Sequence, residues 1–308
     1  MIVQVGCAGP TRLTRYEFTR QAMGGRAEIV LYARTRDEAV AAAGDAFERI
    51  QHLDSVLSDY RAQSELMRVC ERAGTGPVRA SDDLIAVLRV AETISRASDG
   101  AFDVTVGPIV RLWRRAGRDG RLPDRDELAA AMSRVGWQKV QIDPSARTVS
   151  LAVAGMRLDL GGIGKGFAAD EALAELKRHG LSRSLVNLGG DIAVGDPPPG
   201  ETGWRIMPAW FVDDPPGQPL LIANAGVAGS GDAERFVEVD GVRYSHIVDP
   251  RTGIGLTHRT AVVVIASDGT TADALASAAS VLGPERGAEL VERLGGRAIF
   301  RRIGADPP

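Results

Sequence analysis

Cysteine is scarce in this chain, which has only Cys7 and Cys70 among its 308 residues. Two cysteines this far apart in sequence do not make a disulfide framework. Histidine is also rare, and the four histidines lack the paired spacing of an obvious zinc site. The sequence contains neither a G-x-S-x-G elbow nor the context of a cysteine nucleophile, so these two kinds of nucleophilic enzyme are not indicated.

Long apolar stretches are missing as well, and none reaches the length of a membrane-spanning helix. The N-terminus lacks the basic and apolar regions of a signal peptide. Cys7 resembles the end of a lipoprotein signal, but only six residues precede it. We therefore expect a cytoplasmic protein, with a periplasmic or membrane-anchored lipoprotein as the alternative if the start is truncated. The net charge of −3 gives no general attraction to nucleic acid.

The most informative segment is Asp159 to Asp170, with the sequence DLGGIGKGFAAD. An apolar stretch at 156–160 predicts a strand before it, and 168–176 predicts a helix after it. Between them lie four glycines, Gly161, Gly162, Gly164 and Gly166. Glycine has no Cβ, so such a turn lets the backbone approach a phosphate, and Lys165 adds a positive charge. The spacing matches neither common nucleotide fingerprint, and a tight turn without a ligand remains the alternative.

The order of the predicted elements indicates the fold class. Helical periodicity predicts a helix at 36–57, and further helices are predicted to begin near Pro108 and at 82, 125, 168, 271 and 285. Strands are predicted at 27–33, 140–142, 149–151, 184–188, 204–207, 220–228, 236–239, 242–244, 260–266 and 298–300. Hairpins and helices are mixed without regular βαβ alternation, which predicts an α+β fold with largely antiparallel sheets. A diverged internal duplication is compatible with this order.

A second candidate feature is the pair Asp273 and Ser277, four residues apart on a predicted helix. Residues at this spacing face the same way, and an oxygen pair there suits Mg²⁺ when phosphates complete its coordination. The alternative is an exposed Asp and an incidental Ser on a helix surface. The many alanines of this helix weaken that alternative, because a small-residue face lets a bulky ligand lie against the helix.

Two further side chains have two interpretations each. Tyr60 follows the helix predicted at 36–57 and is either a core aromatic or a ring that contacts a flat ligand. His246 follows a predicted hairpin and is either satisfied by a neighbour or acts as a proton carrier or phosphate contact, since neutral imidazole is available near pH 7.

Seven segments together resemble the ApbE family of FAD:protein FMN transferases, from about Met23 to Gly296. They are 58–61 with 64–65, 100–103 with 106–108, 159–170, 186–191, 230–232, 244–253 and 272–277. Each segment alone is weak evidence, but seven in the family's order are specific. The resemblance implies a T-fold-like α+β architecture. It implies an N-terminal extension at 1–22 with little order, followed at 23–308 by a flavin transferase domain of two closely packed subdomains.

The same resemblance implies Mg²⁺-dependent transfer of FMN from FAD to a Thr or Ser hydroxyl of an acceptor protein, with release of AMP. It implies that Mg²⁺ is bound by Asp273, the Ser277 hydroxyl and the Gly162 carbonyl. The implied FAD contacts are Met23, Tyr60, Ala101, Phe102, Asp103, Asp159, Lys165, Ile247 and Ala276. Asp273 is then catalytic, and His246 is the candidate that helps to remove the proton of the acceptor hydroxyl.

The resemblance also implies a partner, because acceptors in this family are redox membrane subunits or flavoprotein domains with a short threonine motif. Two other functions fit the same residues. An FAD pyrophosphatase would use water as the acceptor and give FMN and AMP. A non-catalytic protein would bind FAD without turnover.

Overall fold

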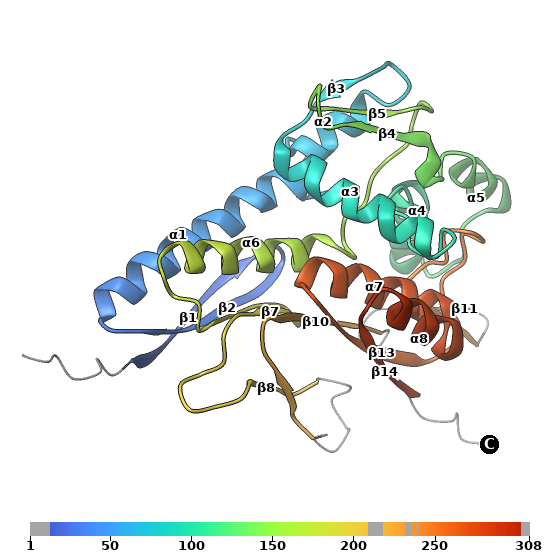
Figure 1. Ribbon diagram of the computed structural model, residues 1–308. Coiled ribbons are helices and arrows are strands. Elements are labelled where there is room, and N and C mark those ends of the chain that lie inside the picture. Colours follow the sequence, from blue (N-terminus) through green and yellow to red (C-terminus); the bar gives the residue numbers. More distant parts are fainter. Residues whose placement is uncertain (1–12, 209–217, 232–235, 240, 303–308) are drawn as a thin grey trace, which may run out of the picture.

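The computed structural model describes residues 13–208, 218–231, 236–239 and 241–302. Cys7, and Asp232 at the end of one family-like segment, lie outside the described residues. The centre of the protein is a seven-stranded sheet in the order β1-β2-β6-β7-β10-β13-β14 (Figure 1). Its strands are β1 (Thr14–Ala22), β2 (Gly25–Ala33), β6 (Ser184–Leu188), β7 (Asp191–Val194), β10 (Ala225–Ser230), β13 (Thr260–Ala266) and β14 (Arg297–Arg302). Every neighbouring pair is antiparallel, which confirms the predicted α+β class.

Side chains of the central strands alternate between the two faces of the sheet, as strand geometry requires. In β2, Ile29 and Leu31 join the main core on one face, and Val30 packs on the other face with Trp204. Both faces are therefore covered, which explains why the central strands are almost wholly apolar.

Helices cover the face of the main core, and a two-stranded ribbon covers the opposite face (Figure 1). The helices are α1 (Arg36–Leu57), α6 (Gly164–Arg178), α7 (Gly269–Leu282) and α8 (Pro284–Arg293). The ribbon consists of β8 (Trp204–Ile206) and β9 (Leu220–Ile222). Within the described residues, none of the helices is long and apolar enough to cross a bilayer.

The remaining elements form a second group beside the helical layer (Figure 1). They are α2 (Glu65–Glu71), α3 (Asp82–Ala97), α4 (Gly107–Asp119), α5 (Arg125–Met132) and the short helix η1 (Trp137–Lys139), with a sheet in the order β3 (Val78–Arg79), β5 (Thr148–Leu151) and β4 (Val140–Asp143). A hairpin of β11 (Phe236–Val239) and β12 (Val242–Ser245) lies against α4.

Local signals start several helices where the sequence predicts them. The hydroxyl of Ser81 accepts from the Leu84 N–H at the start of α3, and Asp124 accepts from two amides at the start of α5. The start of α7 differs from the predicted start at 271, because the helix begins at Gly269. Asp268 is the cap, because its carboxylate accepts from the Thr271 N–H at 2.7 Å.

Residues 14–22 lie inside the expected N-terminal extension, yet they form β1. This strand pairs with β2 over its whole length, from Thr14 opposite Ala33 to Ala22 opposite Gly25. β1 is an edge strand, and its side chains are largely exposed. Charged residues are tolerated at such positions, so the alternation of apolar and polar residues that predicts a strand is weak here. The partly buried rings of Tyr16 and Phe18 pack against the core and anchor it.

Three helices that are distant in sequence are joined by one guanidinium. Arg49 of α1 donates to Asp83 of α3 at 2.8 Å and to Glu171 of α6 at 3.1 Å. The hydrogen bond from Arg49 lowers the pKa of Asp83. Only 20 % of the Arg49 side chain is exposed, so solvent screens this network less than it screens a surface ion pair.

We expect Arg49→Met to lower the free energy of unfolding by about 2 kcal/mol, because it leaves two half-buried carboxylates without their guanidinium. Urea denaturation at pH 7 measures the change. Arg89→Met, on an exposed position of α3, is the matched control and should change stability by less than about 0.5 kcal/mol. Equal effects of the two substitutions would contradict a stabilising role for the network.

Candidate functional site

The glycine-rich loop brings the first turns of α6 and α7 into backbone contact. A Cβ built on Gly166 would lie 2.1 Å from the carbonyl oxygen of Gly269 and 2.8 Å from the Cβ of Asp273. A Cβ on Gly162 would lie 2.5 Å from the Ser277 hydroxyl oxygen. The glycines therefore allow a close backbone approach to α7 of the same chain, and the approach to a phosphate stays a prediction.

Asp273 lies at this contact and is 5 % exposed. Its Oδ2 accepts a hydrogen bond from the backbone N–H of Gly166 at 3.0 Å. Burial raises the pKa of Asp273 well above its usual value, the charge of Asp191 raises it further, and the charge of Lys165 opposes the rise. A buried carboxylate of this kind is stabilised in its charged form by a nearby cation.

Lys165 supplies one such cation, and Asp191 holds it. The Lys165 ammonium pairs with the Asp191 carboxylate, which is 2 % exposed at the start of β7. Burial raises the pKa of Asp191, and the Lys165 charge opposes that rise. We did not predict a role for Asp191, although it ends one of the family-like segments. The signal for it was an acidic residue directly after the Gly189-Gly190 turn.

The donor set for a metal ion fits a hard divalent cation. The Asp273 carboxylate and the Ser277 hydroxyl lie one turn apart on α7, and the Gly162 backbone lies against that turn. All three groups offer oxygen, which Mg²⁺ prefers, and phosphate oxygens commonly complete its octahedral shell. These residues could hold Mg²⁺ at the start of α6.

Tyr60 and Asp159 lie at the entrance to the same loop and are joined by Arg114 of α4. The Arg114 guanidinium donates to Asp159 at 3.0 Å and to Asp59 at 2.5 Å, and its carbon lies 4.4 Å from the centre of the Tyr60 ring. Tyr60 is 74 % exposed, so the interpretation of a core aromatic is wrong. The sequence did not predict a role for Arg114, because no motif or spacing distinguishes it from the neighbouring arginines.

The segment 101–103 also borders the loop, because the Phe102 ring lies 3.5 Å from the Cβ position of Gly162. The Asp103 carboxylate is buried and accepts from the Thr105 N–H, the Thr105 hydroxyl and the Trp137 N–H, at 2.8, 2.6 and 2.8 Å. Burial raises its pKa, and these donors oppose the rise. The Asp103 carboxylate therefore stabilises this turn through its hydrogen bonds. Ala101 and Phe102 are buried at the same turn.

The other predicted contacts come from three separate elements. Met23 lies in the turn between β1 and β2, with φ of 48°. Ala276 is buried on α7 beside Ser277. Ile247 follows β12, and its N–H donates to the Ser245 hydroxyl at 3.0 Å. His246 precedes it on an exposed bend.

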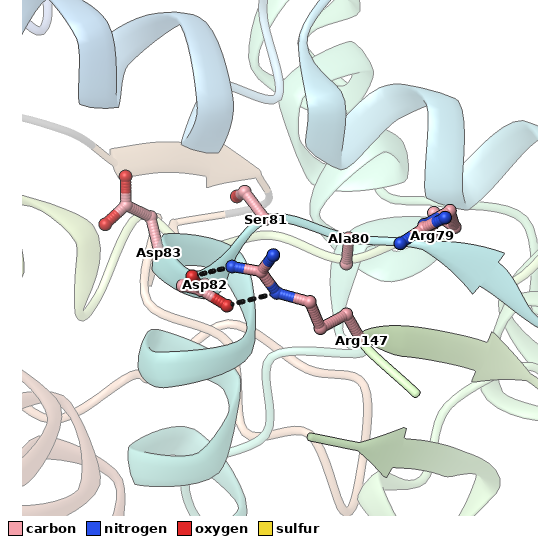
Figure 2. A pocket seen from close by; sticks show the side chains of 6 residues that line it. All are labelled: Arg79, Ala80, Ser81, Asp82, Asp83 and Arg147. Atoms are coloured by element: carbon pink, nitrogen blue, oxygen red, sulfur yellow. Dashed lines mark hydrogen bonds and ion pairs between the residues drawn. The ribbon is translucent and has the colours of Figure 1, made fainter. Parts of the chain in front are cut away.

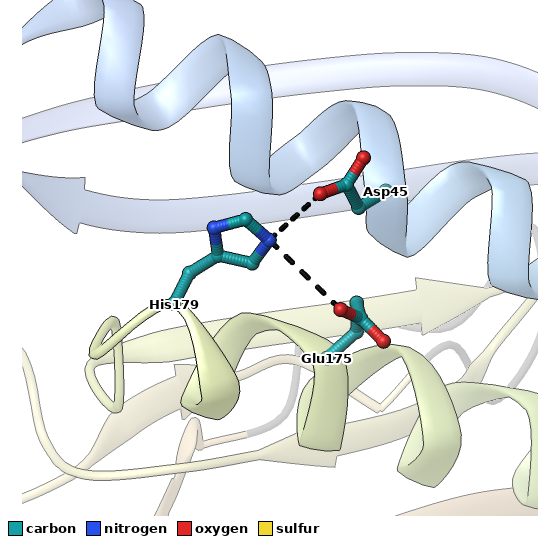
Figure 3. A group of neighbouring side chains, drawn as sticks. All are labelled: Asp45, Glu175 and His179. Carbon is teal, nitrogen blue, oxygen red and sulfur yellow. Dashed lines mark hydrogen bonds and ion pairs between the residues drawn. The ribbon is translucent and has the colours of Figure 1, made fainter.

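A second group of metal-ligand side chains lies at the far end of α6 (Figure 3). The Nε2 of His179 is 2.8 Å from Asp45 and 3.9 Å from Glu175. Glu175 is eleven residues after Gly164, which is about 16 Å along a helix. Arg178 already pairs with Glu175, so this group is a surface ion-pair cluster away from the loop.

A surface hollow at the start of α3 is also separate from the site (Figure 2). It is lined by Arg79, Ala80, Ser81, Asp82, Asp83 and Arg147. Arg147 and Asp82 form an exposed ion pair across it. None of the predicted site residues lines this hollow.

Comparison with known proteins identifies the class. The model of the ApbE family matches residues 23–300. An "FAD:protein FMN transferase" of Treponema pallidum (strain Nichols) is 35% identical over 307 residues, covering 94% of this chain and 85% of the relative. One of Klebsiella pneumoniae (strain 342) is 33% identical over 293 residues, covering 92% of this chain and 88% of the relative.

Solved structures agree with these relatives. The flavinyl transferase ApbE of Pseudomonas stutzeri superposes with a TM-score of 0.84 at 31% identity, covering 95% of this chain and 92% of that chain. The flavin transferase ApbE of Vibrio cholerae gives 0.83 at 28% identity, covering 94% of each chain. The protein is a transferase enzyme. The chain belongs to the ApbE family, which confirms the resemblance seen in its sequence motifs.

We expect Gly166→Ala to lower the free energy of unfolding by about 3 kcal/mol, because the new methyl group would overlap the Gly269 carbonyl oxygen. Gly164→Ala is the matched control two residues earlier, where the nearest atom to a Cβ is 3.8 Å away. It should leave stability unchanged or raise it slightly. Thermal and urea unfolding of both variants measure the difference, and a fully stable Gly166→Ala protein would contradict the backbone contact.

Proposed function

We propose that this protein transfers FMN from FAD to a Thr or Ser hydroxyl of an acceptor protein and releases AMP, in a reaction that requires Mg²⁺. The observation that carries the proposal is the buried Asp273 carboxylate, in contact with the glycine loop and close to Lys165. The family and the names of its relatives support FAD as the substrate.

We place the pyrophosphate of FAD at the start of α6, where this helix meets α7. The N-terminal end of α6 lies against α7 there, and a helix N-terminus favours anions. The first amides of α7 already donate to Asp170 and Asp268, so they are not part of this anion site. Lys165, held by Asp191, adds a positive charge. Mg²⁺ bound by Asp273, Ser277 and the Gly162 carbonyl would neutralise charge on the pyrophosphate oxygens. The amides of Gly161, Gly164 and Gly166 already donate within the protein, so Lys165 and the cation would orient these oxygens for in-line displacement.

In the transfer step, the acceptor hydroxyl oxygen bonds to the phosphorus of the FMN half. The bond from that phosphorus to the bridging oxygen breaks, and AMP leaves with the electron pair. The hydroxyl proton must leave as well, and the exposed His246 is the proposed residue that helps to remove it.

The rest of FAD is proposed to contact residues around this junction. Tyr60 offers an exposed ring, and Arg114 links this ring to Asp159 in the loop. The other proposed contacts are Met23, Ala101, Phe102, Asp103, Ile247 and Ala276. The acceptor is proposed to be a redox membrane subunit or a flavoprotein domain with a short threonine motif, whose hydroxyl must reach the phosphorus.

An assay with FAD and Mg²⁺, with and without an acceptor flavoprotein of known flavinylation site, tests the reaction. We expect AMP release only when the acceptor is present, and mass spectrometry should show the acceptor heavier by one FMN. The matched control is the same acceptor with its target threonine replaced by alanine, which should remain unmodified. AMP release without an acceptor would show an FAD pyrophosphatase instead, and bound FAD without AMP would show a non-catalytic binding protein.

We expect Asp273→Asn to reduce AMP release by about 100-fold or more, because it removes the charged ligand that holds the cation. Asn keeps the shape of the side chain and removes a buried charge, so the free energy of unfolding without Mg²⁺ should not fall. Wild-type protein should gain thermal stability with Mg²⁺ and FAD, and the variant should gain less. Glu285→Gln, on the exposed first turn of α8, is the control. Full activity of Asp273→Asn would remove the metal assignment.

A further inference from the structure

We propose that Arg114 is a positioning residue that holds the Tyr60 ring as a stacking surface for a planar heteroaromatic ring of the substrate. This proposal rests on the proposed function, because it takes FAD as the ligand. The isoalloxazine and the adenine of FAD share the required chemistry, a flat π-system that stacks on an aromatic ring.

The backbone of Arg114 is fixed by the packing of α4. The indole N–H of the neighbouring Trp113 donates to the carbonyl of Gly253 at 2.8 Å, and this ring is buried. At the start of α4, a Cβ on Gly107 would lie 2.7 Å from the carbonyl oxygen of Arg157. The position of α4 is therefore fixed by contacts both at its start and beside Arg114.

The guanidinium of Arg114 is fixed in turn by two carboxylates from distant parts of the chain. Asp59 follows α1 and Asp159 begins the glycine loop, and each accepts from a different nitrogen of the guanidinium. Asp159 is itself held, because its Oδ1 accepts from the Gly161 N–H at 2.8 Å. The planar fork of arginine suits such a bridge, which the point charge of lysine cannot reproduce.

Arg114 lies over one face of the Tyr60 ring. The guanidinium carbon lies 4.4 Å from the ring centre, a cation–π distance, and the ring is nevertheless 74 % exposed. The face of the ring opposite Arg114 is therefore accessible. An exposed aromatic side chain that lacked the contact with Arg114 would lose more rotamer freedom when a ligand binds. The contact therefore pre-organises the Tyr60 ring for a stacked ligand.

The charge of Arg114 is already used inside the protein. It faces two carboxylates, Asp59 and Asp159, whereas Lys165 is the cation beside the proposed pyrophosphate site. Because the Gly161 N–H also holds Asp159, the loss of Arg114 should act on FAD affinity mainly through Tyr60 and leave the transfer step itself nearly unchanged.

The test measures FAD affinity by titration calorimetry and kcat by AMP release, for Arg114→Ala and Arg114→Lys. We expect both variants to weaken FAD binding by about three- to tenfold, the scale of one aromatic contact, with kcat changed by less than about twofold. Arg114→Lys keeps a positive charge between the two carboxylates, so we expect this variant to fold. A thermal melt measures whether its stability is retained. Arg115→Ala is the matched control, since the adjacent side chain forms an exposed pair with Glu127, and FAD affinity should not change.

A second measurement separates positioning from a purely structural role. In a Tyr60→Ala background, Arg114→Lys should cause no further loss of FAD affinity, whereas Tyr60→Phe alone should keep wild-type affinity because the ring face is retained. Titrations with FMN and with ADP identify the stacked ring, since only the ligand that carries it should lose affinity in Arg114→Lys.

Two results would overturn the proposal. One is a fall in kcat with unchanged FAD affinity, which would place Arg114 on the reacting phosphates. The other is an equal loss of affinity with and without the Tyr60 ring. If wild-type protein binds no FAD at all, the proposed function fails first, and this role of Arg114 fails with it.

Discussion

The contact between the first turns of α6 and α7 determines the geometry of everything around it. At Gly166 the two backbones are so close that no side chain fits between them. This proximity lets the Gly166 amide donate to Asp273, and the Gly162 backbone lies against the Ser277 hydroxyl. The positive end of α6 and a set of oxygen donors are thereby brought to one place, which is the combination that a diphosphate and a hard cation require.

Buried charge is the second constraint on the site. Asp191 and Asp273 are buried and Asp159 is nearly so, and burial raises the pKa of each. Cations at fixed positions oppose the rise in pKa. Lys165 lies beside Asp191, and Arg114 lies beside Asp159. Such an arrangement is costly for folding but useful in an enzyme, because its charges are oriented before the substrate arrives.

Much of the fold could be predicted because its strongest signals are local. The periodicity of 36–57 gives α1 with the bounds that the structure shows, and the capping role of Ser81 follows from its side chain. β1 was missed because an edge strand does not need an apolar pattern. Asp191 was missed as a site residue because its role depends on Lys165, which is 26 residues away in sequence.

The sequence by itself determined the α+β class, the family, and the glycine loop with its Asp273–Ser277 pair, because these depend on short-range patterns and spacing. Only the tertiary structure decided that Tyr60 is an exposed ring, that Asp103 is engaged in its own turn, and that Arg114 joins Asp59 to Asp159. The physical reason is that exposure and charge pairing depend on which segments meet in space. Residues 59, 114 and 159 meet only because α4 is pinned beside the loop.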